Sequence, residues 1–303
     1  MVAFLRLIRL PNLLIVALTQ YLLYSQIITP VLQQNKIPPA LDFQLFSLLI
    51  LVTTLITAGG YIVNDIVDLR IDRINKPHKV IISRRIPHQT AYWLYFCINI
   101  GGFFLATYLA FVADRMALLI LFPAAVVGLL LYSIILKKSP LWGNLLVSGY
   151  CAGVAAIVWI AEQSSITQLP ENELNKINHL LVFYAVFAFF STLFREIVKD
   201  IEDAHGDASA KARTAPIVWG IFVAKTLAAI AGAILLLTLV YAAFAMRGAM
   251  NVWGLPFLAL VGILIIISLV LLQKAHQKKD FHYISQFAKI IMLCGILLLL
   301  FFK

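Results

Sequence analysis

The sequence predicts an all-α polytopic membrane protein with about nine transmembrane helices. The chain has 303 residues, of which 62% are hydrophobic and 13% charged, whereas about a quarter of the residues in soluble domains are charged. Its mean hydropathy is +0.94. Windows of roughly twenty mainly apolar residues, enough to cross a hydrocarbon core of about 30 Å, recur along its whole length. We therefore expect one transmembrane domain over residues 1–303.

The windows follow one another in this order. The first, 13–33, is too long for the core of a signal peptide, so we expect it to be retained. The second, 43–66, contains Gly59 and Gly60, which either let this helix approach a neighbour or let it unwind. The other windows lie at 91–113, 116–136, 141–161, 179–198, 217–245, 252–273 and 285–302. Lys289 is an isolated charge in the last window, and we expect its side chain to snorkel toward the cytoplasmic end.

The basic residues predict the orientation of the chain in the membrane. Cytoplasmic loops are enriched in Lys and Arg. If the N-terminus is cytoplasmic, most of the 24 basic residues lie on that side, and the opposite side holds only Lys36, Arg115, Lys176, Arg247 and Lys303. We expect an integral protein of the cell inner membrane with cytoplasmic motif-bearing loops and an external C-terminus. The net charge of +10 then reflects topology and anionic lipid rather than nucleic acid.

Carboxylates concentrate in two of the cytoplasmic segments. Eight of the fourteen Asp and Glu residues follow the second and sixth spans. Both segments read D-x-x-D-x-x-x-D, with Asp65, Asp68 and Asp72 in the first and Asp200, Asp203 and Asp207 in the second. Steps of three and four place the three carboxylates of each set on one helix face. Because such sets are costly at a membrane edge, we interpret both as parts of a functional site.

The repeated spacing also predicts internal symmetry. It suggests two similar four-helix units, or pseudo-repeats, plus a ninth helix, with the two motifs facing each other across a central cavity. The first motif spans residues 64–72 and the second residues 200–207.

A dense set of carboxylates favours a hard divalent cation. Mg²⁺ prefers oxygen ligands from a few carboxylates, retained water and substrate phosphates. The first motif has no glycine at the turn and no closing glutamate of a calcium loop. We therefore expect the six aspartates to be the Mg²⁺ ligands and the catalytic residues. Basic residues interleaved with them are suited to bind a diphosphate: Lys76, Lys79, Arg84, Arg85, Lys199, Lys211 and Arg213.

A diphosphate held at the membrane face, with its tail among apolar side chains, is most simply an isoprenyl diphosphate. Metal ions and cations would stabilise the departing pyrophosphate while C1 of the allylic chain develops carbocation character. We therefore expect transfer of a prenyl group to a lipophilic acceptor inside the bilayer.

At these residues the chain resembles the UbiA superfamily of intramembrane prenyltransferases. That family has an N-D-x-x-D-x-x-x-D segment after the second helix and a D-x-x-D-x-x-x-D segment after the sixth, and residues 64–72 and 200–207 match both. The resemblance extends to the helix count and topology. It implies that the six aspartates bind Mg²⁺ and diphosphate and that Asn64 is a further contact in the first site.

The residues that flank the motifs resemble those of one branch of the family. Many members with aromatic acceptors have R-x-x-R-P after the first motif and Y-x-x-x-K-D leading into the second. Here the first stretch reads "INKPHKVIISRRI", and Arg195 stands at the tyrosine's place with Lys199 retained. This resembles the digeranylgeranylglyceryl phosphate synthase branch, although "VIISRRI" departs from its P-I-P-S-G-R-I form. The resemblance implies geranylgeranyl diphosphate as donor and geranylgeranylglyceryl phosphate as acceptor.

Two alternatives stay open from the sequence. One is a prenyltransferase with an aromatic acceptor such as 4-hydroxybenzoate. The other is a transporter of a phosphorylated or anionic metabolite, although transporters usually place their charges near the bilayer midplane. An acceptor with its own phosphate needs further cations, which Arg195, Lys199, Arg84 or Arg85 would supply.

Overall fold

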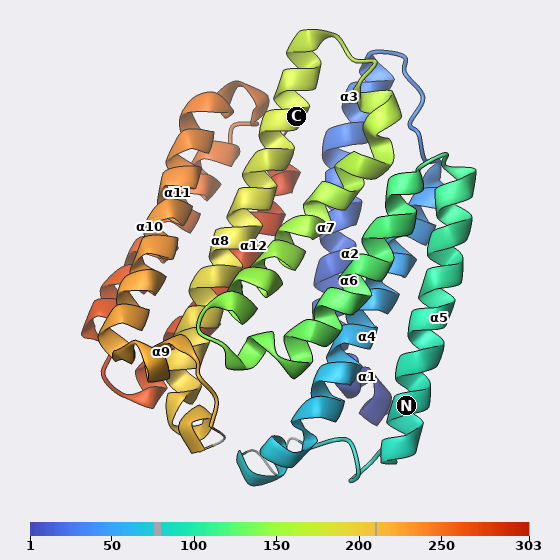
Figure 1. The fold of residues 1–303 in the computed structure, drawn as a ribbon. Helices are drawn as coiled ribbons and strands as arrows, with labels where there is room; N and C mark the ends of the chain where they lie inside the picture. Colours follow the sequence, from blue (N-terminus) through green and yellow to red (C-terminus); the bar gives the residue numbers. More distant parts are fainter. Residues whose placement is uncertain (76–79, 210, 303) are drawn as a thin grey trace. The chain divides into compact units, whose positions relative to one another are not determined.

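The computed structural model describes residues 1–75, 80–209 and 211–302, and the regular structure there is helical apart from two isolated β-bridges (Figure 1). The long helices are α2 (Leu10–Leu22), α4 (Phe43–Asn75), α5 (His88–Val112), α6 (Met116–Ile134), α7 (Trp142–Ile166), α8 (Glu171–Ser209), α10 (Gly220–Ala245), α11 (Gly254–Lys274) and α12 (Lys278–Leu297). The short ones are α1 (Val2–Leu7), η1 (Leu23–Ile28), α3 (Thr29–Gln34), η2 (Leu136–Lys138), α9 (Ala215–Val218), η3 (Arg247–Ala249) and η4 (Leu298–Phe301).

The predicted spans are confirmed. Nine helical segments among the described residues are long and apolar enough to cross a membrane, at 10–34, 43–70, 88–112, 116–138, 142–166, 171–209, 220–245, 254–274 and 278–301. The helices that carry the motifs are longer than the predicted windows. At 1.5 Å per residue, α8 is about 60 Å long, so its ends extend well beyond a hydrocarbon core of about 30 Å.

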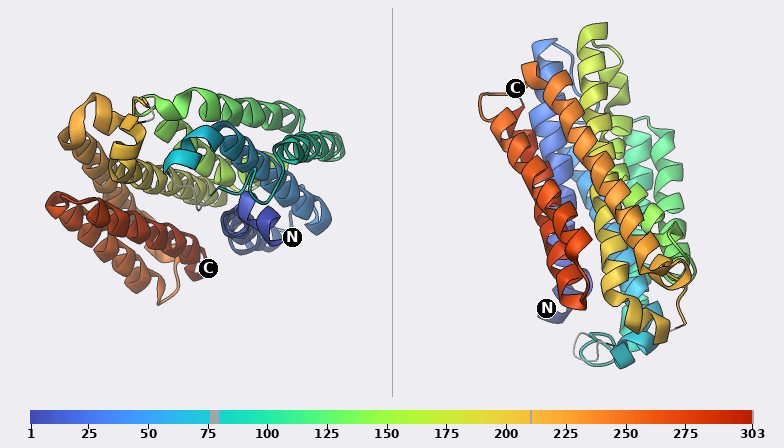
Figure 2. Two further views of the ribbon diagram at one scale, coloured as in Figure 1. Left: turned by 90° about the horizontal axis from the view of Figure 1, so that it is seen from below. Right: turned by 90° about the vertical axis from the view of Figure 1, so that its left-hand side faces the viewer.

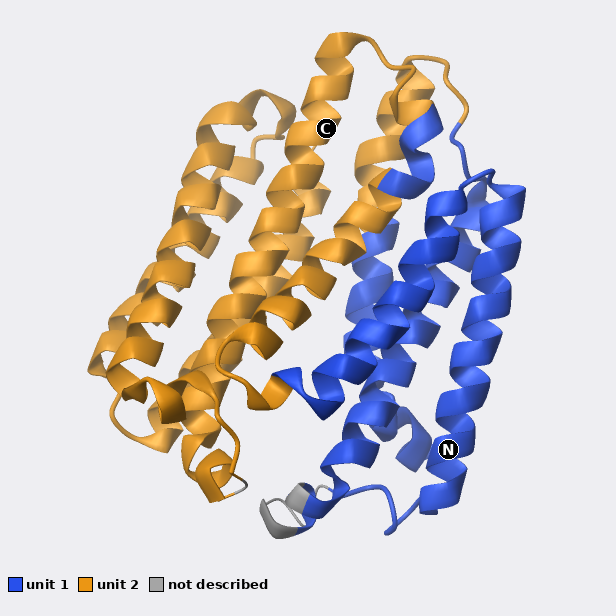
Figure 3. Ribbon diagram, in the orientation of Figure 1, with its two compact units in different colours: residues 1–21, 39–136, 160–164 blue, residues 22–38, 137–159, 165–303 orange. Residues whose placement is uncertain are grey.

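The chain divides into two compact units, coloured separately in Figure 3. Unit 1 comprises residues 1–21, 39–136 and 160–164, and unit 2 comprises residues 22–38, 137–159 and 165–303. In unit 1, α4 packs against α5 and α6. In unit 2, α8 packs against α10 and α12, and α11 packs against α10 and α12, which the two directions of Figure 2 also show.

Two adjacent glycines explain how closely the helices of unit 1 approach. A Cβ atom on Gly59 would lie 2.6 Å from the side-chain nitrogen of Asn99 in α5, and one on Gly60 would lie 2.9 Å from a methyl carbon of Leu129 in α6. The helix α4 continues unbroken through both residues. Of the two interpretations of this glycine pair, the structure therefore bears out close approach rather than unwinding.

The hydrophobic core of unit 2 holds α8, the helix that carries the second motif, in position. Leu193, Phe194, Ile197, Val198 and Ile201 lie on one side of α8 and pack against α10 and α12, contacting small residues such as Ala224, Ala228 and Ala288. Burial of this apolar side leaves the polar residues of the same turns on the remaining surface of α8. The carboxylates of the second motif are thus held by a well-packed helix rather than by a loop.

Candidate functional site

The first aspartate motif lies on the last turns of α4. The helix runs to Asn75, so Asp65, Asp68 and Asp72 are helical and, at spacings of three and four, lie along one side. A small pocket is lined by Asp65, Leu69 and Asp72 of α4 and by residues 80–82 of the following segment. This pocket brings two of the predicted carboxylates to a common space.

Arg9 contacts the first motif. From the sequence it was expected only to help set the orientation of the chain in the membrane. Its guanidinium donates a hydrogen bond of 3.0 Å from Nη2 to Oδ1 of Asp65 and lies 4.5 Å above the ring of Tyr61. Asn12 donates to the Tyr61 hydroxyl at 3.1 Å. Arg9 has a positive φ of 53° and lies at the break between α1 and α2. The sequence signal was "RLPN", an arginine and an asparagine flanking a proline at the start of a span.

The segment after α4 presents two of the predicted cations at the tip of a tight turn. Ser83 has a φ of 69° and donates its N–H to the carbonyl of Ile86 at 2.7 Å. Ile82 and Ile86 are buried in a cluster with Ile62 and Ile66 of α4, α1 residues and α5 residues. Arg84 and Arg85 lie between these two anchors and are exposed. Lys76 and Lys79, also predicted to contact the diphosphate, lie outside the described residues.

The second motif lies on the last turns of α8 and has a partner on α7. Asn144 is 8% exposed and donates from its side-chain nitrogen to Oδ2 of Asp200 at 2.8 Å. The hydroxyl of Ser148 donates to the backbone carbonyl of Asn144 at 2.7 Å, one helical turn further on. A buried amide thus fixes the rotamer of Asp200. Asn144 was not predicted from the sequence, where it stands out only as a polar residue near the start of the fifth span.

Two further carboxylates of α8 are paired with cationic or titratable groups. Arg195 donates to Glu196, the next residue, and His282 of α12 contacts Oε1 of Glu202 through Nδ1 at 2.8 Å. Arg195 was predicted to contact substrate, and its Nε is buried without a hydrogen-bond partner among the described residues. His282 received no role from the sequence because the residue facing it lies 80 positions away.

A compact turn follows the second motif. The backbone N–H of Ala212 donates to the carbonyl of Asp207 at 3.0 Å, and the N–H of Arg213 donates to the carbonyl of Lys138 at 2.8 Å. Lys211, with a φ of 57°, and Arg213 have exposed side chains. The structure therefore keeps both predicted cations close in sequence and space to the end of the α8 motif.

The aspartates of the two motifs are suited to a divalent cation whose coordination shell is completed by oxygen atoms of the substrate and by water. Among the described residues, no three carboxylate, imidazole or thiolate groups are gathered into a metal centre of their own. Mg²⁺ needs only one or two protein carboxylates when phosphate oxygens and water complete its octahedron. The pocket of Asp65 and Asp72 and the Asp200 side chain oriented by Asn144 supply donors of that kind.

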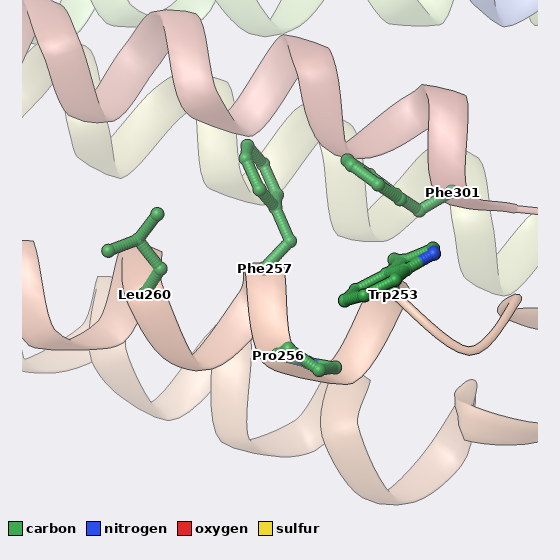
Figure 4. A pocket seen from close by; sticks show the side chains of 5 residues that line it. All are labelled: Trp253, Pro256, Phe257, Leu260 and Phe301. Carbon is green, nitrogen blue, oxygen red and sulfur yellow. The ribbon is translucent and has the colours of Figure 1, made fainter.

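A second pocket lies at the opposite end of unit 2. It is lined by Trp253, Pro256, Phe257, Leu260 and Phe301, as Figure 4 shows, with Phe257 and Phe301 stacked at 4.7 Å between ring centroids. Phe302 also contacts Tyr184, which lies 19 residues, or roughly 30 Å along α8, from Asp203. The lining of this pocket is thus apolar and aromatic.

Comparison with known proteins gives a family for this fold and these motifs. Residues 31–293 match the UbiA prenyltransferase family. A digeranylgeranylglyceryl phosphate synthase of Saccharolobus solfataricus is 36% identical over 171 residues, which is 56% of this chain and 55% of the relative. The enzyme of the same name from Methanoculleus marisnigri is 32% identical over 222 residues, 72% of this chain and 69% of the relative. The chain thus aligns with little more than half of the first relative and about two thirds of the second.

Solved structures share the fold. A structure described in work on digeranylgeranylglyceryl phosphate synthase in membranes has a TM-score of 0.70 at 23% identity, covering 98% of this chain and 96% of that one. A UbiA homologue from Archaeoglobus fulgidus, bound to GPP and Mg²⁺, has a TM-score of 0.56 at 16% identity and covers 98% of this chain and 99% of that one. With a family match over most of its length and nine apolar helices of spanning length among its described residues, the chain is an integral membrane protein that belongs to the UbiA prenyltransferase family.

Proposed function

We propose that this protein is a Mg²⁺-dependent intramembrane prenyltransferase that transfers a geranylgeranyl group from geranylgeranyl diphosphate to geranylgeranylglyceryl phosphate. The observation that carries the proposal is the pair of identically spaced aspartate motifs on the ends of α4 and α8, each followed by exposed cationic side chains, which are Arg84 and Arg85 for the first and Lys211 and Arg213 for the second. The relatives named digeranylgeranylglyceryl phosphate synthase support this acceptor, and the homologue bound to GPP and Mg²⁺ supports the donor class and the metal.

The residues have separate tasks in this reaction. Bound Mg²⁺ would neutralise the diphosphate and ease its departure. Asp65, Asp68 and Asp72 on α4 and Asp200, Asp203 and Asp207 on α8 would hold the metal, with Asn64 as a further contact, and we propose that both motifs act on one substrate in a single domain. The cations Lys76, Arg84, Arg85, Lys211 and Arg213 would bind the diphosphate.

The apolar surroundings complete the mechanism. The prenyl tail would lie among hydrocarbon side chains of the spans, which exclude water from the allylic C1 while it develops positive charge. The hydroxyl of the acceptor then forms the new C–O bond at C1 as the bond from C1 to the diphosphate breaks, and its proton leaves to solvent or to the departing pyrophosphate.

We also propose the orientation that the basic residues indicate. The N-terminus and both motifs would face the cytoplasm, and the C-terminus would lie outside the inner membrane. A phosphatase reporter fused after Lys303 is then expected to be active, and the same reporter fused at the N-terminus inactive; the reverse pattern would contradict this orientation.

The test of the function is turnover by the purified full chain with Mg²⁺ and labelled geranylgeranyl diphosphate. We expect pyrophosphate release and a diether product with geranylgeranylglyceryl phosphate, and no product with 4-hydroxybenzoate. Product with 4-hydroxybenzoate alone would favour an aromatic-acceptor enzyme. Absence of pyrophosphate release with either acceptor, in folded protein, would contradict enzymatic function and leave transport of an anionic metabolite as the better account.

A further inference from the structure

The antiparallel pairing of α8 and α12 fixes which side chains lie opposite each other within unit 2. His282 of α12 contacts Glu202 of α8 at 2.8 Å. Further along the same pair, Gly295 lies against Phe187 so closely that a Cβ on the glycine would overlap the phenylalanine ring. Between these two contacts the register is continuous, so two turns beyond His282 the residue Lys289 lies level with Arg195.

Lys289 is therefore part of a cluster of cations rather than an isolated charge. By this register Lys289 is level with Arg195, and Lys199 follows Arg195 by one helical turn on the same side of α8. Glu196 and Glu202 are the glutamates of this part of α8. The ammonium group of Lys289 donates to the side-chain oxygen of Gln286, one turn back on its own helix, at 3.1 Å. The snorkelling expected from the sequence did not include these neighbours on α8.

The nearby carboxylates are already engaged. Glu196 accepts from Arg195, and Glu202 is in contact with His282. Within the described part of the chain Lys289 has no carboxylate partner, and the buried Nε of Arg195 has no acceptor. A buried Arg195 donor without an acceptor, and a Lys289 ammonium whose printed partner is a neutral amide, are costly on membrane-spanning helices and would be stabilised by an anion.

The cluster begins beside the metal-binding end of α8, at Lys199, and extends deeper along the helix to Arg195. Arg195 precedes Asp200 by five residues, Asp203 by eight and Asp207 by twelve, which corresponds to about 7.5, 12 and 18 Å along the helix axis. An anion among Lys and Arg side chains needs no metal ion, whereas a diphosphate among aspartates does. Arg195 and Lys289 thus offer a second anion site of a different kind, more than one helical turn deeper along α8 than Asp200, with Lys199 between the two sites.

We propose that Arg195, Lys199 and Lys289 bind the phosphate monoester of the acceptor lipid, with Lys289 as the cation supplied by α12. This assignment rests on the proposed prenyl transfer to a phosphorylated acceptor. A phosphate monoester carries nearly two negative charges and three acceptor oxygens, which suits three cations converging from two helices. Anionic membrane lipids offer the same headgroup chemistry, so the test separates the two sources.

The test measures direct binding to the full chain in phosphatidylcholine nanodiscs. The probes are geranylgeranylglyceryl phosphate, its dephosphorylated analogue and geranylgeranyl diphosphate. We expect Lys289→Met to weaken binding of the phosphorylated acceptor by about ten- to a hundredfold, while binding of the other two probes stays unchanged. Lys289→Arg is expected to retain most of the affinity. Lys278→Met, a loss of charge at the exposed first residue of the same helix, is the matched control and should bind all three probes normally.

Three results would overturn the inference. They are unchanged affinity of Lys289→Met for the phosphorylated acceptor, an equal loss for the dephosphorylated analogue, and a loss confined to geranylgeranyl diphosphate. Competition by added phosphatidylglycerol, strong enough to displace the acceptor, would assign the cluster to lipid headgroups instead. Turnover measured in parallel keeps the proposed function separate, because a wild-type chain that binds the phosphorylated acceptor but releases no pyrophosphate contradicts the function alone.

Discussion

At the scale of single residues, each aspartate motif has a carboxylate that accepts a hydrogen bond from a side chain elsewhere in its own unit. Arg9 holds Asp65 in unit 1, and Asn144 holds Asp200 in unit 2. The two partners differ in chemistry. A guanidinium supplies charge to a partly exposed carboxylate, whereas a neutral amide that is itself buried supplies only orientation. Substitutions at the two partners therefore have different expected effects.

Removal of the Asn144 amide should weaken metal binding. We expect Asn144→Ala to raise the Mg²⁺ concentration for half-maximal turnover, or lower turnover itself, by about ten- to a hundredfold, since Asp200 loses the hydrogen bond that orients it. The measurement is pyrophosphate release across a Mg²⁺ series. Ser148→Ala is the control, because that hydroxyl bonds only the backbone carbonyl of Asn144. A wild-type Mg²⁺ dependence in Asn144→Ala would show that Asp200 needs no such orientation.

Loss of Arg9 should affect stability most when the metal is absent. Arg9→Met removes the guanidinium that pairs with Asp65, so we expect the free energy of unfolding to fall by about 0.5–1 kcal/mol, the range for a partly exposed ion pair. Thermal unfolding in detergent with EDTA should reveal this loss, and excess Mg²⁺ should largely restore stability. The exposed Arg6 provides the control variant Arg6→Met. Equal destabilisation with and without Mg²⁺ would argue that Arg9 is structural only.

At the scale of elements, the helices that carry the motifs are placed by close packing of small residues. Gly59 and Gly60 allow α5 and α6 to pack closely against α4, and alanines on α10 and α12 make room for apolar side chains of α8. Such small residues allow helix backbones to approach in a membrane, where burial of apolar surface gives little driving force. The positions of the carboxylates depend on these contacts because each motif continues the helix that they hold.

Enlargement of Gly60 should disturb this packing. We expect Gly60→Leu to lower the stability of the folded chain by about 1–3 kcal/mol, because even its Cβ would press against Leu129. The midpoint of thermal unfolding in detergent measures the change. Gly101→Ala on α5 is a suitable comparison, since nothing lies within 4 Å of its Cβ. A Gly60→Leu variant as stable as the wild type would mean that α4 and α6 have room that the structure does not show.

The elements also show what a sequence can and cannot predict. The nine spans and the two aspartate motifs are local patterns, so length, hydropathy and spacing predicted them directly. The partners Arg9, Asn144 and His282 escaped prediction because each meets its carboxylate across 56 to 80 positions of sequence. Which residue faces which across two helices is set by packing register, and a single sequence does not reveal this register.

At the scale of the whole molecule, the two units divide the motifs between them. Unit 1 carries the first motif with its turn of Arg84 and Arg85, and unit 2 carries the second motif with Lys211 and Arg213. The sequence repeat predicted two similar halves plus a ninth helix. Of the nine spans among the described residues, the second and third lie in unit 1, the sixth to ninth lie in unit 2, and residues of the first, fourth and fifth occur in both. Each unit thus supplies one set of carboxylates to the proposed reaction.

The central claim is that both motifs are needed for Mg²⁺-dependent prenyl transfer, and the most direct measurement is pyrophosphate release by Asp68→Asn and by Asp203→Asn. Asp42→Asn is the control, because Asp42 lies outside the motifs and accepts from the N–H of Leu45 at the start of α4, a role that asparagine also fills. We predict that each motif variant inserts normally and loses at least about a hundredfold in rate, while Asp42→Asn keeps the wild-type rate. Wild-type release by both motif variants at saturating Mg²⁺ would contradict the account.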